Sequence, residues 1–377
     1  MTIGILGGGQ LGYMLALAGY PLDFHFRFLD PSPQAPVGRI APRVTADYTD
    51  FESLEKFAHG LALVTYEFEN VPVEAVRHLQ KTVPVYPPPQ ALEAAQDRRS
   101  EKNLFRKLGI PTTEFACVDS AADLDVAVKS IGLPAILKTC RLGYDGKGQW
   151  RLLTAEDVAR AKAEIPAVPL ILEKLVHFTR ELSILAVRSR SGETAFYPLV
   201  ENHHRAGILR LSLAPAPHLA DPLQREAEAA ARRVLEALDY VGVLAIELFE
   251  CEGRLLANEM APRVHNSGHW TIEGAVTSQF ENHLRAVAGL PLGETRTLGH
   301  SAMLNLIGEV PEPAELLALP DAHLHLYGKA LRPGRKVGHV TLRAPSWAEL
   351  YRRFEQLPAF FRREEFCLPP HRSEASN

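Results

Sequence analysis

Two glutamates in the second half of the chain could hold a metal ion between them. Glu247 and Glu259 lie in consecutive apolar runs that are typical of adjacent strands. A three-residue loop at Cys251–Gly253 would join those strands. In that register Glu247 faces Ala257, and Glu259 lies diagonally across on the same face. Because oxygen ligands favour Mg²⁺ over zinc, the pair is a candidate magnesium site. Two solvated glutamates at the rim of a sheet are the alternative.

A lysine and a glycine-rich loop could hold a triphosphate. Lys138 ends a buried strand, and the loop Gly143–Gln149 begins five residues later, with Lys147 inside it. A lysine at the end of a strand can contact phosphate oxygens, and a glycine backbone can approach them closely. The spacing does not fit the GxxxxGK[ST] pattern. The sequence therefore indicates a phosphate site of another kind, with a simple hairpin turn as the alternative.

The chain opens with a second glycine pattern. Gly7–Gly12 fits GxGxxG after an apolar run, and Asp30 stands at the end of the next run. The pattern is compatible with a pyrophosphate of NAD, with a tight turn that needs glycine for packing, or with one phosphate of another ligand. A single glycine fingerprint does not decide among these three interpretations.

A polar loop follows the second glutamate strand. The segment Asn258–His269 brings a carboxylate, an arginine, two histidines, an amide and a hydroxyl together. Loops this polar after buried strands are more often sites than scaffolding. The segment contains no CxxC spacing, and we do not expect a transition metal here. It is therefore predicted to belong to the active site.

A basic cluster near the C-terminus could bind an anion. Glycine and proline separate its members, which are Lys329, Arg332, Arg335, Lys336 and His339. A solvated loop and an anion clamp are equally compatible with this composition.

The elements that must position these residues fall into three units. The first has strands at Thr2–Leu6, Phe24–Leu29 and Leu61–Thr65, a helix at Tyr13–Ala18, and a charged helix at its exit, Leu92–Leu108. The second has strands at Pro134–Thr139, Gln149–Leu153 and Leu170–Leu175, with a helix at Ala155–Glu164. The third has strands at Leu182–Arg188, Thr194–Val200, Val241–Phe249 and Arg254–Glu259, with a helix at Leu223–Leu238. The first unit is predicted to form a parallel sheet with ligands at its carboxyl edge.

Composition excludes several classes of protein. The 377 residues suffice for two or three packed units, and the net charge of −4 gives no argument for nucleic acid or a membrane surface. The four cysteines lie far apart, which suits a reducing cytosol and excludes a disulfide framework. No apolar run reaches the ~18 residues needed to span a bilayer, and a secretory signal is not expected. We therefore expect a cytoplasmic protein that does not bind membranes or nucleic acid.

Taken in order, the motifs resemble those of the 5-(carboxyamino)imidazole ribonucleotide synthase family, in the ATP-grasp superfamily. The resemblance runs from Ile3 to about Leu342, and APRVHNSGHWT is its most specific string, followed by GYDGKGQ. It implies an α/β chain, α+β in the lid, with the ATP-grasp fold. Its domains would be a Rossmann-like parallel-sheet domain at 1–95, a lid at 96–176, and an ATP-grasp domain with a C-terminal substrate-binding segment at 177–377.

The resemblance also implies the ligands and their residues. ATP would be bound by Arg98, Lys138, Gly143, Tyr144, Asp145, Gly146, Lys147, Gly148, Gln149, Glu173, Lys174, Leu175, Val176, Glu181, His204, Asn258 and Glu259. Mg²⁺ would be bound by Glu247 and Glu259. The substrates, 5-aminoimidazole ribonucleotide and bicarbonate, would meet Gln10, Tyr144, Asp145, Lys147, Arg263, His265, Lys329 and Arg335. Arg263, His265 and Lys329 would be the catalytic residues.

The implied reaction is ATP-dependent carboxylation of the ribonucleotide through carboxyphosphate, in purine biosynthesis, by a homodimer. Two positions depart from the family pattern: Tyr13 replaces a frequent arginine, and Leu142 replaces a frequent glycine. A closer rival is another ATP-grasp ligase, of the biotin carboxylase or the formate-dependent glycinamide ribonucleotide transformylase type. An NAD-binding oxidoreductase is a more distant alternative, because that interpretation rests on the first thirty residues alone. A non-enzymatic binding module is a third alternative, and it would require some of these charged groups to be missing.

Overall fold

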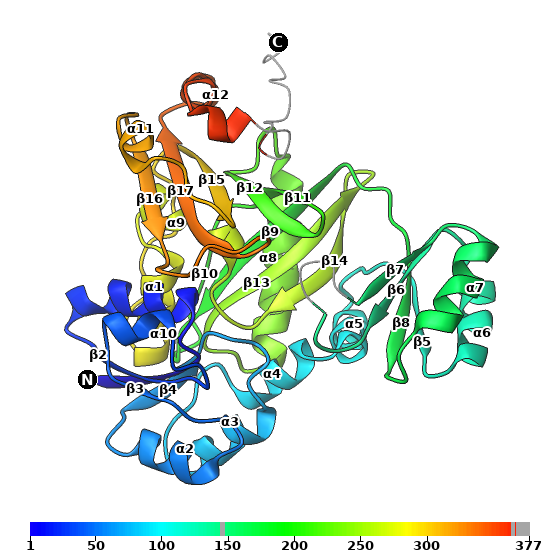
Figure 1. The fold of residues 1–377 in the computed structure, drawn as a ribbon, viewed down its shortest axis with the longest axis horizontal. Helices are drawn as coiled ribbons and strands as arrows, with labels where there is room; N and C mark the ends of the chain where they lie inside the picture. Colours follow the sequence, from blue (N-terminus) through cyan, green and yellow to red (C-terminus); the bar gives the residue numbers. More distant parts are fainter. Residues whose placement is uncertain (144–147, 363–365, 367–377) are drawn as a thin grey trace.

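The computed structural model describes residues 1–143, 148–362 and 366, and three β-sheets organise them (Figure 1). The N-terminal sheet is parallel, with strand order β3-β2-β1-β4. Its strands are β1 (Thr2–Leu6), β2 (His25–Leu29), β3 (Arg43–Val44) and β4 (Leu63–Tyr66). Its helices are α1 (Gln10–Gly19), η1 (Tyr20–Leu22), η2 (Pro36–Arg39), α2 (Phe51–Ala58) and α3 (Val73–Gln80). The strands are apolar on both faces because helices cover both, so the predicted parallel sheet is confirmed.

The lid is an antiparallel sheet that projects from the rest of the molecule (Figure 1). Its strand order is β5-β8-β6-β7, with β5 (Phe115–Val118), β6 (Ala135–Thr139), β7 (Gln149–Leu152) and β8 (Leu170–Lys174). Two helices, α6 (Ala121–Ile131) and α7 (Ala155–Glu164), pack their apolar sides on this sheet. The α7 helix begins where predicted because Thr154 and Asp157 form a capping box there.

The single charged helix predicted over Leu92–Leu108 is wrong. The segment forms two helices, α4 (Pro89–Ala95) and α5 (Arg98–Lys107). Asp97 has extended backbone angles, and its carboxylate accepts hydrogen bonds from the amides of Arg99 and Ser100 at 3.0 and 3.2 Å. An aspartate in this conformation starts a new helix, which is why the two segments separate.

The largest sheet has nine strands in the described residues, and neighbouring strands among them pair antiparallel. Its order is β14-β13-β9-β11-β12-β15-β17-β16, and β10 pairs with β9. The strands are β9 (Arg180–Arg188), β10 (Thr194–Phe196), β11 (Val200–Arg205), β12 (Ile208–Ala214), β13 (Gly242–Cys251), β14 (Arg254–Ala261), β15 (His300–Ile307), β16 (Ala322–Leu326) and β17 (Lys336–Ala344). The predicted strand Thr194–Val200 begins at the right residue but is too long, because Pro198 cannot donate to a ladder and separates β10 from β11.

Helices cover the large sheet on both sides. The α8 helix (Asp221–Ala237) buries its predicted stripe against β9, β13 and β14. The α10 helix (Gln279–Ala288) packs against α1, so the parallel sheet is joined to the large sheet through a shared apolar cluster. The remaining helices are η3 (Asn266–Gly268), α9 (Thr271–Gly274), α11 (Pro313–Leu317), α12 (Trp347–Glu355) and η4 (Ala359–Arg362).

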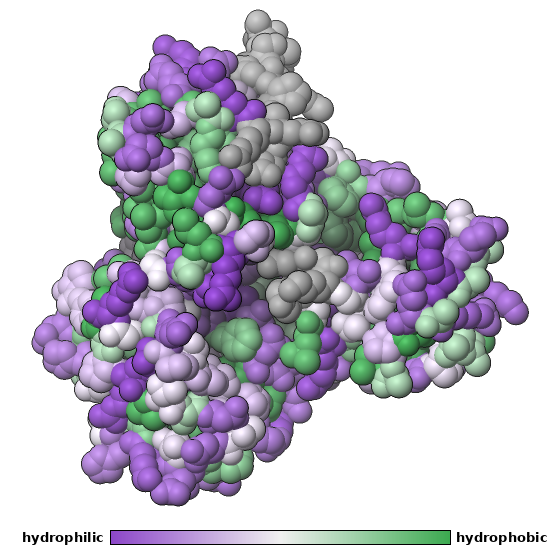
Figure 2. All heavy atoms as spheres, viewed as in Figure 1, coloured by the Kyte–Doolittle hydropathy of each residue, from purple (hydrophilic) through white to green (hydrophobic). Residues whose placement is uncertain are grey.

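Hydrophilic side chains predominate over α2 and α3 on the face shown in Figure 2. Among the described residues, no helix combines the length and the apolar character needed to cross a membrane.

Candidate active site

A cavity of about 1080 Å³ lies between the lid, the large sheet and the loop that follows β4. This volume lies at the upper end of the ~300–1,000 Å³ range that is typical of small-molecule pockets. Many residues predicted for the site line it: Arg98, Lys138, Gly143, Gln149, Glu181, His204, Glu247, Asn258, Glu259, Arg263 and His265. Side chains separated by as much as 167 residues of sequence therefore share one cavity.

The two glutamates face each other more directly than predicted. Residues Glu252 and Gly253, with φ of 51° and 74°, form a two-residue turn of the type that suits hairpins. The predicted three-residue loop is therefore wrong. A register shift inserts Asn258 as an extra residue in β14, and this bulge brings Glu259 directly opposite Glu247. The predicted convergence holds, but it depends on a bulge that the sequence did not reveal.

The electrostatics of the pair favour a cation. Burial, and then the charge of Glu259, raise the pKa of Glu247 to about 7. Burial acts most strongly, and it raises the pKa of Glu259, but Arg98, whose guanidinium donates to it at 2.8 Å, and the charge of Lys138 together lower that pKa to about 2. Two buried carboxylates that repel each other would both ionise readily beside a divalent cation.

The neighbouring amide supplies a further oxygen. The side-chain oxygen of Asn258 is buried, lines the cavity and has no hydrogen-bond partner in the part of the chain that the structure describes. In that same part no three His, Cys, Asp or Glu side chains gather as a metal cluster. Two carboxylates and an amide fit Mg²⁺, which usually keeps ligands from phosphate and water, better than they fit zinc.

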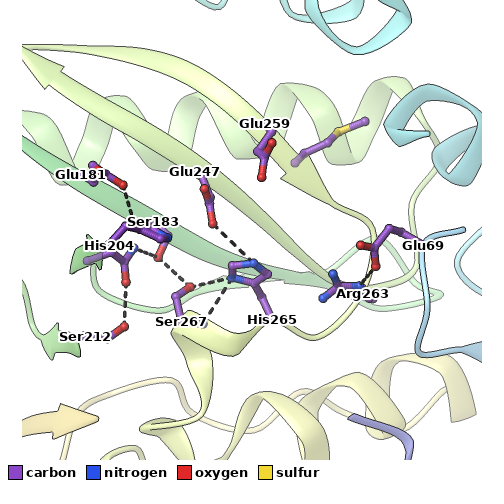
Figure 3. A network of polar contacts seen from close by, with 12 residues as sticks. Glu69, Glu181, Ser183, His204, Ser212, Glu247, Glu259, Arg263, His265 and Ser267 are labelled. Carbon is purple, nitrogen blue, oxygen red and sulfur yellow. Dashed lines mark hydrogen bonds and ion pairs between the residues drawn. The ribbon is translucent and has the colours of Figure 1, made fainter. Parts of the chain in front are cut away.

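A polar network runs behind the glutamates (Figure 3). The Nε2 atom of His265 lies 3.5 Å from Glu247, and its Nδ1 lies 2.9 Å from the hydroxyl of Ser267. The chain continues from Ser267 to Ser183 at 2.8 Å and from there to Asn202 at 2.9 Å. Because Ser183 donates to Ser267, the Ser267 hydroxyl is available to donate to Nδ1. The proton of the ring is then on Nε2, directed at Glu247.

His265 is a neutral group in this environment. Burial, and then the charge of Arg263, lower the pKa of His265 to about 3. The contact with Glu247 is therefore a weak polar contact rather than an ion pair. A ring with this pKa is a poor proton acceptor near neutrality, so the geometry favours orientation of Glu247 over general-base chemistry.

Arg263 connects the large sheet with the N-terminal unit through an ion pair. Its guanidinium is paired with Glu69, in the loop after β4, and it also donates to the carbonyl of Val264 at 2.9 Å (Figure 3). Glu69, with Phe68 and Asn70, lines the cavity, but the sequence analysis assigned these residues no role. The signal was an acidic segment at the carboxyl end of a parallel strand, which is where ligands of such sheets bind.

Lys138, the lysine predicted to contact phosphate, is paired with a carboxylate of the protein. The Nζ of Lys138 donates to Glu173 at 2.9 Å, and Lys102 lies 3.8 Å from the same oxygen. The carboxylate of Glu173 is thus directed at lysines, and it is not among the cavity-lining residues. Lys174, Leu175 and Val176 do not line the cavity either. Their predicted contact with adenine stays a prediction.

A carboxylate and a histidine approach each other elsewhere in the cavity wall. His204 lies 2.5 Å from Glu181. Burial acts to lower the pKa of His204, but the hydrogen bond to Glu181 and the charge of Glu247 raise it. Close by, the rings of Phe178 and Phe249 stack with centroids 4.8 Å apart, and both line the cavity. This apolar surface suits a planar base, and the sequence analysis missed it.

The lid loop is described only at its ends. Tyr144, Asp145, Gly146 and Lys147 lie outside the described residues. Leu142, which replaces a frequent glycine, has φ of 59°, a conformation that costs a leucine ~1–2 kcal/mol. Gly148 has φ of 68°, and a Cβ there would lie 2.7 Å from the hydroxyl of Thr139. The glycine at position 148 is therefore required by both conformation and packing.

A second group of predicted residues gathers beside the cavity. Lys329 donates to the side-chain oxygen of Gln10, although neither lines the cavity. Burial is the main cause that lowers the pKa of Lys329 to about 8, and Arg335 and Lys336 act in the same direction. The guanidinium of Arg39 packs against Gly328, the residue before Lys329. Lys336 lines the cavity and so joins the two groups.

The N-terminal glycine motif does not have its backbone amides available for a dinucleotide. Glu67 accepts hydrogen bonds from the amides of Gly9 and Gly12 at 2.8 and 3.3 Å, and Asp30 accepts from Gly8 at 2.6 Å. These amides are the donors that a pyrophosphate would need, and carboxylates of the protein already use them. The NAD interpretation is therefore wrong.

Known protein families and individual relatives match this chain over nearly its whole length. Three family models match: the ribonucleotide synthetase preATP-grasp domain at 1–96, the ATP-grasp domain at 103–280, and the phosphoribosylaminoimidazole carboxylase C-terminal domain at 301–353. The N5-carboxyaminoimidazole ribonucleotide synthase of Pseudomonas aeruginosa is 58% identical, over 95% of this chain and 99% of that protein. That of Brucella melitensis is 48% identical, over 90% and 95%.

Solved structures agree in fold. The synthetase of this name from Thermus thermophilus has a TM-score of 0.91 and 60% identity, covering 94% of this chain and 97% of that one. An Aspergillus clavatus enzyme in complex with ADP and 5-aminoimidazole ribonucleotide has a TM-score of 0.87 and 33% identity, covering 94% and 96%.

Proposed function

This chain belongs to the N5-carboxyaminoimidazole ribonucleotide synthase family of ATP-grasp ligases, and we propose that the cavity between its lid and its large sheet is the site of the reaction. The enzyme is an ATP-dependent carbon–nitrogen ligase that carboxylates 5-aminoimidazole ribonucleotide with bicarbonate in purine biosynthesis. The observation that carries the assignment of the site is the facing pair Glu247 and Glu259 in one cavity with Arg98 and Lys138.

ATP binds between the lid and the large sheet in this proposal. Arg98 and Lys138, with the loop from Gly143 to Gln149, surround the phosphates. Glu181 contacts the ribose, His204 makes a further contact with the nucleotide, and the segment Glu173–Val176 contacts adenine. The support for this arrangement is the position of the two basic residues and of Glu181 on the wall of one cavity.

Mg²⁺ would be held by Glu247 and Glu259, with the side-chain oxygen of Asn258, which has no partner among the described residues, beside them. When bound, it neutralises charge on the phosphoryl group that is transferred. His265 orients Glu247 through its Nε2 proton, and the serine network fixes the ring. Arg98 donates to Glu259 through one nitrogen of its guanidinium, and its other N–H groups can donate to a phosphate.

The chemistry proceeds in two steps. An oxygen of bicarbonate attacks the γ-phosphorus of ATP, which forms carboxyphosphate and releases ADP. The exocyclic amine of the ribonucleotide then attacks the carboxyl carbon, phosphate leaves, and the amine nitrogen loses a proton. Arg263 stabilises the negative charge on the carboxyl oxygens in a site where burial strengthens its effect.

The ribonucleotide phosphate binds Lys329 and Arg335, and Gln10 orients the lysine. Tyr144, Asp145 and Lys147 complete the substrate shell in this proposal. The N-terminal, lid and C-terminal domains are proposed at 1–95, 96–176 and 177–377, and the active form is proposed to be a cytoplasmic homodimer, as the family resemblance implies.

The function is tested by ADP release from the purified chain. ADP should appear at an appreciable rate only when ATP, Mg²⁺, bicarbonate and 5-aminoimidazole ribonucleotide are all present. Equal ADP release without the ribonucleotide, or release supported by glycinamide ribonucleotide and formate instead, would refute the assignment.

A further inference from the structure

The α5 helix carries two charged side chains that the reaction described above does not use. Glu101 and Lys102 are only 2% and 1% exposed, and they lie on the same side of the helix as Arg98 and Phe105. Burial of charged side chains is costly unless they are paired and hydrogen-bonded. The groups that Glu101 and Lys102 contact therefore identify the part of the structure that this side of α5 stabilises.

Both side chains bind the backbone of β14 on either side of its bulge. The Nζ of Lys102 donates to the carbonyl of Ala257 at 3.2 Å. The carboxylate of Glu101 accepts from the amide of Met260 at 2.6 Å. β14 is the edge strand of the large sheet, where an isolated bridge joins Ala257 to Thr112. Through Lys102 and Glu101, α5 supplies further partners for the outward backbone groups of Ala257 and Met260. Asn258 and Glu259 lie between the two anchored residues.

Lys102 also reaches the lid. Its Nζ lies 3.8 Å from the Glu173 oxygen that accepts from Lys138 at 2.9 Å. Glu173 is on β8 and Lys138 is on β6, both strands of the lid sheet. Lys102 thus connects the bulge that presents Asn258 and Glu259 with the lid lysine proposed to contact phosphate.

We propose that Lys102 is a positioning residue that fixes the β14 bulge and the lid strands relative to each other, so that the cation ligands and Lys138 meet the same triphosphate. Glu101 fixes the other side of the bulge. Neither side chain touches substrate in this proposal, which rests on the proposed function. Without these anchors, Glu259 and Asn258 lose their fixed orientation, and the cation and nucleotide bind more weakly.

Two substitutions test the proposal from opposite sides of the bulge. In Lys102→Met, a side chain of similar length loses both contacts. We expect at least a tenfold rise in the Mg²⁺ concentration for half-maximal activity and in the KM for ATP, as removal of partners behind metal ligands usually costs ~10–100-fold. The KM for 5-aminoimidazole ribonucleotide should stay within about threefold of wild type, because Lys329 and Arg335 are on other elements.

Glu101→Gln keeps an oxygen that can accept from Met260, so its Mg²⁺ and ATP parameters should remain close to wild type. Glu101→Leu removes the acceptor and should resemble Lys102→Met. Lys107→Met, on the exposed side of the same helix, is the matched control and should leave all parameters unchanged. Binding of Mn²⁺ to the ADP complex, followed by electron paramagnetic resonance, gives the same comparison without turnover.

The outcomes separate this proposal from the function itself. If wild type shows no ADP release that depends on ribonucleotide and bicarbonate, the proposed function fails first. If wild type is active and folded Lys102→Met and Glu101→Leu keep Mg²⁺ and ATP parameters within threefold, the positioning role is wrong. The role is also wrong if neither substitution gives a folded chain, because the anchors then serve stability alone.

Discussion

Replacing Glu247 by glutamine should make the metal-free protein more stable and the enzyme far less active. Glu247 is directly opposite Glu259 in a buried wall, and burial and then the facing charge raise its pKa from 4.5 to about 7. A rise of this size corresponds to about 3 kcal/mol, at ~1.4 kcal/mol per pH unit. Glutamine keeps the size of the side chain and removes the repulsion, so the apoprotein gains up to this amount.

The sign of the pH dependence follows from the direction of the shift. The folded chain binds the Glu247 proton more tightly than the unfolded chain, so its stability falls as pH rises from about 4.5 to about 7. The glutamine variant lacks this loss. Its advantage should therefore be small at pH 4.5 and full at pH 8, as measured by unfolding in EDTA. Glu252→Gln, in the exposed turn of the same hairpin, is the matched control.

Activity should move in the opposite direction. Loss of a carboxylate from the cation site should lower kcat by at least ~100-fold in an ADP-release assay at saturating ATP and Mg²⁺, which corresponds to about 2.7 kcal/mol of barrier. A glutamine variant that turns over at near-normal rate would show that Glu247 is not a cation ligand. A variant less stable than wild type in EDTA at pH 8 would show that the two carboxylates do not repel each other.

Further substitutions address the other parts of the site. Glu259→Gln should also lower kcat by at least ~100-fold in the same assay, and an unchanged kcat would remove it from the cation site. Lys329→Ala and Arg335→Ala should raise the KM for the ribonucleotide far more than the KM for ATP; a rise in the ATP KM instead would assign both residues to the nucleotide. Because Lys329 has a pKa of about 8 and binds phosphate when charged, kcat/KM for the ribonucleotide should fall above pH 8, and Lys329→Arg should flatten that profile. Gly148→Ala should raise the KM for ATP, since φ is 68° there and the added Cβ meets Thr139; an unaffected KM would show that the loop can shift at no cost.

Local pattern was sufficient for most of the elements. The apolar run Thr2–Leu6 and the helix Ala155–Glu164 have the predicted bounds, because a short apolar run that ends at glycines and a capping box both act within a few residues. Local pattern failed where one residue interrupts a periodic segment. Asp97 starts a new helix inside an otherwise helical stretch, and Pro198 separates β10 from β11.

The sequence by itself determined which residue types reach the cavity, since the strands that carry Lys138, Glu247 and Glu259 could be predicted from their apolar neighbours. Only the tertiary structure decided their partners. The bulge at Asn258 brought the glutamates face to face, and the anchors from α5 that hold it are about 155 residues away in sequence. The physical reason is that a buried charged side chain pairs with the opposite charge or backbone group that the packing places within about 3–4 Å of it. That choice depends on how whole elements pack, and no local pattern encodes it.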